Sequence, residues 1–182
     1  MKEFIVSFGI VMAFTLALFY QNDYNIHQEE IHRLKFVSEE VAAAAAQFFD
    51  RERYGDGYYV FNAQEGIRGA EHVLEQGLYL NEDLSPKPYA YWRQAEKIEY
   101  TVDLVSSINT KRVVNGNIST DINESHVFPK TYNFTHFGKT KSVVLFGPSV
   151  IVTVKTGKPR YRLVADSLLV DNHRTAIHTW EE

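Results

Sequence analysis

The feature that most constrains this chain is the segment FIVSFGIVMAFTLALFY at residues 4–20, which contains no charged side chain. As a helix it rises about 1.5 Å per residue and spans roughly 26 Å, close to the thickness of the hydrocarbon core of a bilayer. A helix that is apolar on all sides must be covered by lipid or by other protein. We therefore predict a membrane anchor over residues 1–23, with these side chains inserted into lipid: Phe4, Ile5, Val6, Phe8, Ile10, Val11, Phe14, Leu16, Leu18 and Phe19.

The charges that flank this segment predict its orientation. Lys2 and the amino terminus precede it, and Asp23, Glu29 and Glu30 follow it. Because positive residues favour the cytoplasmic side, we expect a single-pass membrane protein with a cytoplasmic N-terminus. Its head, residues 24–182, is then extracytoplasmic or displayed on a surface filament. A cleaved signal peptide is the alternative, since Thr15-Leu16-Ala17 offers a small-x-small cleavage site after an apolar region of suitable length.

Residues 26–49 have the pattern of an amphipathic helix that continues the anchor, with apolar residues recurring at a spacing close to seven. The stretch EEVAAAAAQFF at 39–49 adds five consecutive alanines, whose small side chains favour a helix and let another backbone approach closely. The polar stretch QNDYN at 21–25 has poor helix propensity and marks either the membrane surface or a kink. If it does not break the helix, one helix of about 69 Å runs from residue 4 to residue 49. Its expected packing residues are Ile31, Leu34, Val41, Ala42, Ala45, Phe48 and Phe49. The pattern leaves open whether they contact the protein's own sheet or a partner.

The remaining sequence predicts an α+β fold, in which the long helix packs on a small, mainly antiparallel sheet with one further helix. Asn62 and Glu65 form a capping-box pattern before a helix at 63–76, which Gly77 should end. Apolar alternation over 97–107 predicts a half-buried strand, and Asn115-Gly116 predicts a hairpin turn. The other elements we expect are strands at 58–61, 142–146, 149–155 and 160–164, a loop at 81–96, irregular structure at 119–141 and a short C-terminal helix.

Composition limits the classes of partner. A chain of 182 residues with 45% hydrophobic residues suits one folded domain plus an appendage. The net charge of −4 and the lack of a basic stripe argue against nucleic acid. The chain has no cysteine, which removes disulfides and thiol chemistry. We expect membrane lipid and copies of the chain itself, or related small membrane proteins, as its partners.

The residue types that carry chemistry form no recognisable motif. His27 and His32 are five positions apart, so on a helix they lie about 140° apart and cannot share one metal ion. The acidic turn at 50–56 lacks EF-hand spacing because Phe61 stands where the loop needs a glutamate; an ad hoc calcium loop is the alternative to a solvated turn. No nucleophile elbow or phosphate loop occurs. We predict solvated histidines, no metal, no cofactor and no enzymatic activity.

The stretches FIVSFGIVMAFTLALFY and LKFVSEEVAAAAAQFF, followed by a β-rich head, resemble the type IV pilin superfamily. More narrowly, they are similar to the TadE/TadG-like pilin-related proteins of tight-adherence loci. The resemblance covers about the first 50 residues. It departs at the start, where Lys2-Glu3-Phe4 stands in place of the glycine of a prepilin processing site, and Glu3 precedes the apolar stretch instead of lying inside it. The resemblance implies an envelope-located, filament-related or secretion-associated role.

Together these features predict a membrane-anchored, non-enzymatic, pilin-like structural protein, either a subunit or a component of a pilus-like or secretion assembly of the cell envelope. The alternative is a monomeric, membrane-anchored extracytoplasmic module for binding or adhesion. The two differ in whether the long helix contacts neighbouring copies.

Overall fold

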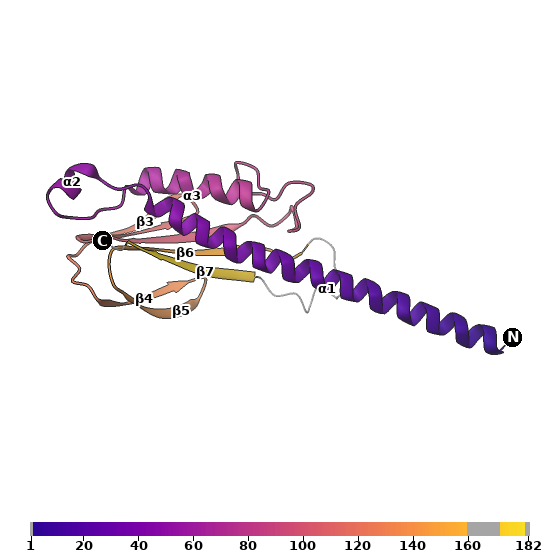
Figure 1. The fold of residues 1–182 in the computed structure, drawn as a ribbon. Coiled ribbons are helices and arrows are strands. Elements are labelled where there is room, and N and C mark those ends of the chain that lie inside the picture. Colours follow the sequence, from indigo (N-terminus) through magenta and orange to yellow (C-terminus); the bar gives the residue numbers. More distant parts are fainter. Residues whose placement is uncertain (1, 160–171, 181–182) are drawn as a thin grey trace.

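The computed structural model describes residues 2–159 and 172–180, which form a three-layered head at one end of a long helix (Figure 1). The first layer holds helices α1 (Lys2–Ala46) and α3 (Ala63–Gly77), the second a five-stranded antiparallel sheet, and the third a two-stranded hairpin. The short helix α2 (Arg51–Gly55) lies at the end of the head opposite the N-terminus. The predicted α+β class, a long N-terminal helix packed on a small antiparallel sheet, is confirmed.

The sheet has the strand order β3-β2-β1-β6-β7, and β4 pairs with β5 in the separate hairpin. Asn115, with a φ of 46°, and Gly116, with a φ of 80°, form the predicted two-residue turn between β2 and β3, where both positions need a left-handed backbone. Gly147-Pro148 separates β5 from β6, so the hairpin and the sheet are joined by a short corner. The strands are β1 (Glu99–Val105), β2 (Asn109–Val114), β3 (Asn117–Asn123), β4 (Lys130–His136), β5 (Lys139–Leu145), β6 (Ser149–Thr156) and β7 (Asn172–Thr179).

Helix α1 runs unbroken through the polar stretch QNDYN at 21–25, so one helix joins the apolar segment to the head. It ends at Ala46, earlier than the predicted residue 49. The amide of Gln47 turns back to the carbonyl of Ala44, and Asp50 then caps α2 by accepting hydrogen bonds from the amides of Glu52 and Arg53. The two phenylalanines before Asp50 therefore lie outside the helix.

Strand β1 is buried on both faces, so its prediction as a half-buried strand was wrong. Tyr100, Val102 and Leu104 pack under α1 and α3, as the alternation indicates. The other face meets the β4–β5 hairpin, where Val105 packs with Phe134 and Leu145. The alternating sequence pattern reveals only the apolar face of β1. The second face carries the polar residues Thr101 and Asp103, and the element that buries it, the β4–β5 hairpin, lies far along the chain.

The prediction that residues 119–141 are irregular was wrong, because this segment supplies most of β3 and all of β4. Strand β3 is an exposed edge strand along its whole length, and β4 buries only alternate side chains near its end. Strands with so little buried surface need few apolar residues, and their polar composition therefore resembles that of a loop.

Two further predictions need correction. The segment 58–61 forms only one antiparallel bridge, Phe61 to Phe49, because Tyr59 and Phe61 donate their amides to the hydroxyls of Ser107 and Ser106 instead of to a strand. The C-terminal segment forms strand β7 and not a short helix, and Ile177 is 41% exposed. The predicted strand at 160–164 lies outside the described residues.

Candidate functional site

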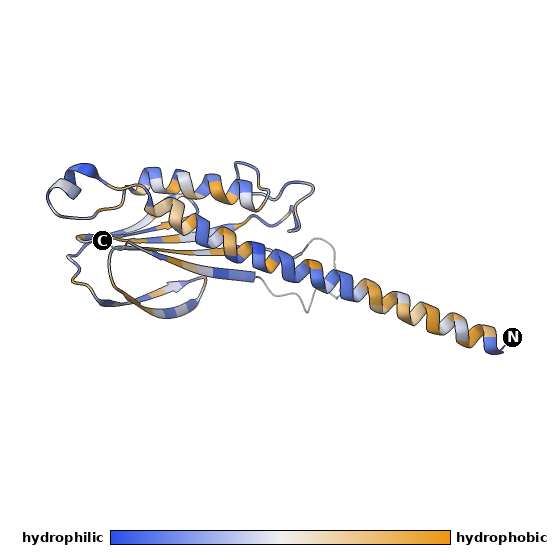
Figure 2. Ribbon diagram, in the orientation of Figure 1, coloured by the Kyte–Doolittle hydropathy of each residue, from blue (hydrophilic) through white to orange (hydrophobic). Residues whose placement is uncertain are grey.

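The apolar N-terminal half of α1 projects from the head as a bare helix (Figures 1 and 2). Among the described residues, α1 is the one helix long and apolar enough to cross a membrane, and the head buries none of its most apolar window. All ten side chains predicted to enter lipid are exposed: Phe4, Ile5, Val6, Phe8, Ile10, Val11, Phe14, Leu16, Leu18 and Phe19, with fractions from 52% for Ile10 to 76% for Phe4. In water this surface would remain uncovered.

The second half of α1 packs against the protein's own head. Of the predicted packing residues, Ile31, Leu34, Val41, Ala42 and Ala45 are buried in the main core. The alanines face α3, whose glycines let the two helices approach: a Cβ on Gly66 would lie 2.9 Å from the carbonyl oxygen of Ala45. One on Gly77 would lie 2.5 Å from a methyl group of Val37. The surface that the alanines contact is therefore α3, together with strands β6 and β7 under α1.

The last two predicted packing residues lie beyond the end of α1. Phe48 is 37% exposed, and its ring lies beside Gly69 of α3. Phe49 is partly buried in an aromatic cluster, with ring centroids 5.3 Å from Tyr54, 5.2 Å from Tyr59 and 6.2 Å from Trp180. These residues close the far end of the core and do not extend the helical stripe.

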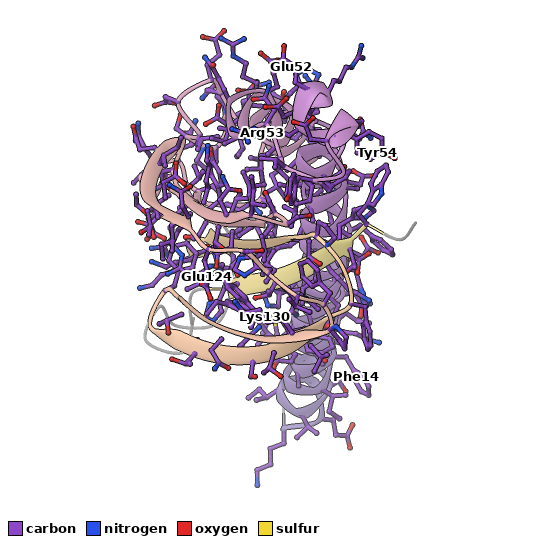
Figure 3. All side chains as sticks on the ribbon, turned by 90° about the vertical axis from the view of Figure 1, so that its left-hand side faces the viewer. Phe14, Glu52, Arg53, Tyr54, Glu124 and Lys130 are labelled. Atoms are coloured by element: carbon purple, nitrogen blue, oxygen red, sulfur yellow. The ribbon has the colours of Figure 1, made fainter. Side chains whose placement is uncertain are left out.

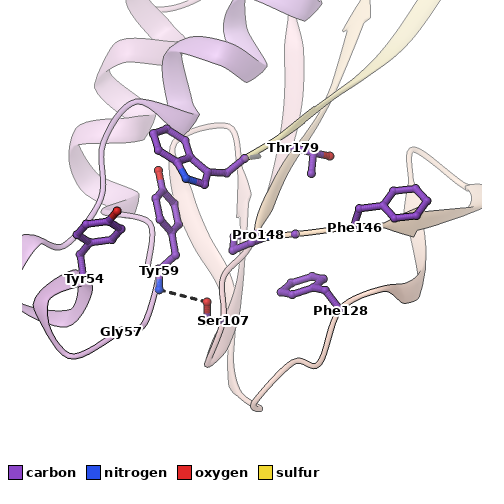
Figure 4. Close-up of a pocket in the computed structure, with 10 residues that line it drawn as sticks. Tyr54, Gly57, Tyr59, Ser107, Phe128, Phe146, Pro148 and Thr179 are labelled. Atoms are coloured by element: carbon purple, nitrogen blue, oxygen red, sulfur yellow. Dashed lines mark hydrogen bonds between the residues drawn. The ribbon is translucent and has the colours of Figure 1, made fainter. Parts of the chain in front are cut away.

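This aromatic cluster forms one wall of a pocket of about 580 Å³ at the far end of the head (Figure 4). Trp180 stacks on Tyr59 at 4.8 Å, and Phe128 and Phe146 line the opposite side. Burial, and then the neighbouring Tyr54, raise the pKa of Tyr59 to about 12, so its phenol stays protonated and donates to the carbonyl of Ala46. Figure 3 looks onto this end, with Glu52, Arg53 and Tyr54 at one side and Glu124 and Lys130 lower on the head. The pocket has the size of a ligand site but contains no nucleophile–base pair among its lining residues.

A second polar feature is enclosed between the sheet and the β4–β5 hairpin. Asp103 of β1, which is 0% exposed, accepts two hydrogen bonds from Arg112 of β2, at 2.6 and 2.7 Å, and one from the hydroxyl of Tyr132 at 3.1 Å. His136 Nε2 lies 3.0 Å from the same carboxylate. An ionised carboxylate only accepts, so Nε2 carries the proton, and Nδ1 lies 2.7 Å from the hydroxyl of Thr153. The carboxylate joins strands β1, β2 and β4, and His136 extends the network to Thr153 of β6. We call Asp103, Arg112, Tyr132, His136 and Thr153 the Asp103 cluster.

Burial alone would raise the pKa of Asp103, but hydrogen bonds from Arg112 and His136 outweigh it and hold the pKa below its usual range. Burial and the adjacent carboxylate raise the pKa of Tyr132, which remains a neutral donor. The order Asp103, His136, Thr153 has the connectivity of a catalytic triad. However, the three side chains are 0%, 3% and 2% exposed, so no substrate reaches the hydroxyl. The cluster is therefore a structural ion pair that fastens the hairpin to the sheet.

His126, in the loop before β4, is also buried. Its Nε2 lies 2.8 Å from the hydroxyl of Thr110, and its Nδ1 lies 2.9 Å from Lys130 Nζ. Burial, and then the charge of Lys130, lower the pKa of His126, which favours the neutral ring that accepts from Lys130. The prediction that the histidines are solvated was therefore wrong for His126 and His136, because both are buried and bond to residues of the sheet, His126 to Thr110 and His136 to Asp103 and Thr153. Within residues 2–159 and 172–180, no group of His, Cys, Asp and Glu is arranged to hold a metal ion.

Part of the Asp103 cluster carried a signal in the sequence. Asp103 interrupts an apolar strand, and a charge in such a strand needs a partner if both faces are buried. The short connection at 106–108 places Arg112 directly opposite Asp103 in the register of β1 and β2. The contributions of β4 and β6 depend on tertiary packing and left no local signal. No family model, curated protein or solved structure matches the chain.

Proposed function

We propose that this protein is a single-pass, membrane-anchored and non-enzymatic subunit of a pilus-like or secretion-type envelope assembly, with its head outside the cytoplasm. The observation that carries the proposal is the bare apolar half of α1, which is long and apolar enough to cross a membrane and of which the head buries no part. Lipid or neighbouring helices must cover such a surface. Because α1 continues into the core, the same helix that enters the membrane also carries the head.

The packing of α1 restricts how copies would contact one another. Ala45 is approached closely by α3, and Ala42 is buried in the core, so this small-residue face offers no surface for a neighbour. Contacts between copies would use residues 4–20, where helix-to-helix burial would replace lipid, and exposed parts of the head. A long helix whose second half lies on an antiparallel sheet is also the architecture that the resemblance to the type IV pilin superfamily implies.

Membrane anchoring is tested by extraction of cell membranes at alkaline pH. We expect the full chain in the membrane pellet, and a variant lacking residues 4–20 in the supernatant. Protease added to the outer side of the membrane should remove the head. Release of the full chain by alkali, or protection of the head from external protease in right-side-out membranes, would contradict the anchored topology.

Contact between copies is tested separately with single cysteines at positions 12, 13, 14 and 15, which sample every side of α1. The chain has no cysteine of its own, so the background is clean. We expect oxidation in native membranes to yield a disulfide-linked dimer from at least one position, while the control Ala42→Cys, which is buried in the core of the head, yields none. Failure of all four positions to cross-link to any protein would remove the assembly role.

The pocket at the far end of the head favours a second candidate, a monomeric anchored binding module. Its volume of about 580 Å³ lies in the range of small-ligand sites, and it faces away from the projecting part of α1. If detergent extracts the anchored protein as a monomer, and none of the four cysteine positions in α1 cross-links, the binding module is favoured over the assembly subunit.

A further inference from the structure

The loop between α3 and β1 presents tyrosines beside the part of α1 that leaves the apolar segment. The Tyr91 hydroxyl lies 2.9 Å from His27 Nδ1, and the Arg33 guanidinium lies 5.1 Å from the centre of the Tyr79 ring. Tyr89 packs edge-on against Tyr79 at 5.6 Å. The loop therefore lies at the level of residues 27–33 of α1, near the base of the head.

Tyr89 is held in place although its side chain is 69% exposed. The next residue, Ala90, is buried and donates its amide to the carbonyl of Lys87, whose own amide bonds to Tyr79. Trp92, two residues further, is 1% exposed and bridges to Pro159. Tyr89 therefore extends from a backbone that is held in place, and most of its large amphipathic ring is exposed.

The length of the apolar segment places this loop close to the lipid. Residues 4–20 span roughly 26 Å, somewhat less than a hydrocarbon core of about 30 Å. Because this apolar segment is shorter than the core, the residues that follow it are drawn toward the membrane surface. The headgroup layer adds roughly 5–7 Å on each side. His27, which holds Tyr91, lies about 10 Å along the helix from Tyr20. A modest tilt of α1 brings one side of the head into that layer.

We propose that Tyr89, together with Tyr20 and Tyr24 on the adjoining face of α1, forms a membrane-contact surface that seats the base of the head on the lipid headgroup layer. Tyr20 is 54% exposed and Tyr24 49% exposed. Tyrosine is suited to this position because its ring is apolar and its hydroxyl bonds to headgroups or water. This inference rests on the proposed membrane anchoring and adds a second contact between protein and lipid.

The charges around this surface favour a neutral headgroup. Glu30 is paired with Arg33 at 3.0 Å, and burial, opposed by that arginine, raises the pKa of Glu30. Asp83 is paired with Lys97 at 3.0 Å. The loop at 78–98 as a whole carries three basic residues, Lys87, Arg93 and Lys97, and three acidic ones, Glu82, Asp83 and Glu96, so it has no net positive charge to attract anionic lipid. The occupant that fits is therefore the interface of a zwitterionic, phosphatidylcholine-type bilayer.

The test uses the full chain in phosphatidylcholine vesicles, with one cysteine that carries an environment-sensitive fluorophore. The reporter is Tyr89→Cys, and Pro88→Cys is a second reporter from the same exposed loop. Phe14→Cys reports insertion of α1, and Tyr58→Cys, 46% exposed near α2 at the far end of the head, is the matched soluble control. Quenchers are a lipid with a nitroxide on its headgroup and a lipid with a nitroxide deep in its acyl chain.

We expect the headgroup nitroxide to quench the label at position 89 at least twofold more than the label at position 58, and the deep nitroxide to quench position 14 most. Addition of anionic lipid should not increase the quenching at position 89. If positions 89 and 88 behave like position 58 while position 14 is quenched, the seating of the head is wrong and the anchor stands. If position 14 is not quenched by either lipid, the membrane anchoring itself fails.

Discussion

Replacement of Asp103 by asparagine should destabilise the head by about 3 kcal/mol. Asp103 is 0% exposed and receives hydrogen bonds from Arg112, Tyr132 and His136. The asparagine amide has the size of the carboxylate but no charge. Its NH₂ group also has to take the place of an accepting oxygen and therefore faces a hydrogen-bond donor. Removal of one partner from a buried pair costs about 3–5 kcal/mol. We place the loss at the lower end because the Arg112 side chain is 29% exposed and can regain water.

The measurement is urea unfolding of the full chain in a mild non-ionic detergent, followed by near-ultraviolet circular dichroism. Asp121→Asn is the matched control, since its carboxylate is 47% exposed and lies 3.6 Å from Lys111 Nζ. An exposed pair of this kind contributes at most about 1 kcal/mol. The reasoning is refuted if Asp103→Asn unfolds within about 0.5 kcal/mol of the wild type, or if the control loses as much.

Three further outcomes follow from the same contacts. Because the pKa of Asp103 is lowered in the folded state, its stabilisation is complete above the unfolded value of about 3.9 and is lost as the pH falls through the folded value. Urea titrations below pH 4 should therefore show wild type and Asp103→Asn converging. Because the pKa of His126 is also lowered, wild type should lose stability as the pH falls below about 6.5, and His126→Asn should flatten that slope in thermal melts. Gly66→Ala should destabilise by about 1–3 kcal/mol, since its Cβ would lie 2.9 Å from the backbone oxygen of Ala45. Gly69→Ala should be neutral or stabilising by up to about 1 kcal/mol in the same assay, because its Cβ is crowded only by the movable Phe48 ring and lies at an ordinary contact distance of 3.5 Å from the oxygen of Ala44.

Local patterns predicted the elements that depend on local physics. The two halves of the long helix follow from the apolar segment and the amphipathic, alanine-rich segment, although the polar stretch QNDYN between them left its continuity open; α3 follows from the cap at Asn62, and the β2–β3 turn from Asn115-Gly116. In each case a few adjacent residues determine the backbone, and the structure agrees. The burial of Ile31 to Ala45 likewise follows from an apolar stripe that one helix carries by itself.

The sequence could not predict features that arise from contacts between distant segments. The hairpin strands β4 and β5 are mostly polar on their exposed side, and only their position over β1 and β6 gives them a buried face. The burial of His136 follows from that placement, since nothing in its own neighbours distinguishes it from a surface histidine. The same holds for Tyr89, whose significance depends on the His27–Tyr91 contact across 64 residues.

In the proposed anchored state, the alanine stretch couples the membrane segment mechanically to the head. Because Ala44 and Ala45 let α3 approach the backbone of α1, the head holds the second half of the helix by close backbone contact instead of through flexible side chains. No glycine or proline interrupts α1 between Gly9 and Ala46, so bending between the anchor and the head is resisted by the helix itself. A tilt of the apolar half must then rotate the whole head toward or away from the lipid. The distance of Tyr89 from the lipid therefore changes with the tilt of residues 4–20. A proline at the exposed position 22 should break this link, so that quenching of a label at position 89 falls while quenching at position 14 persists.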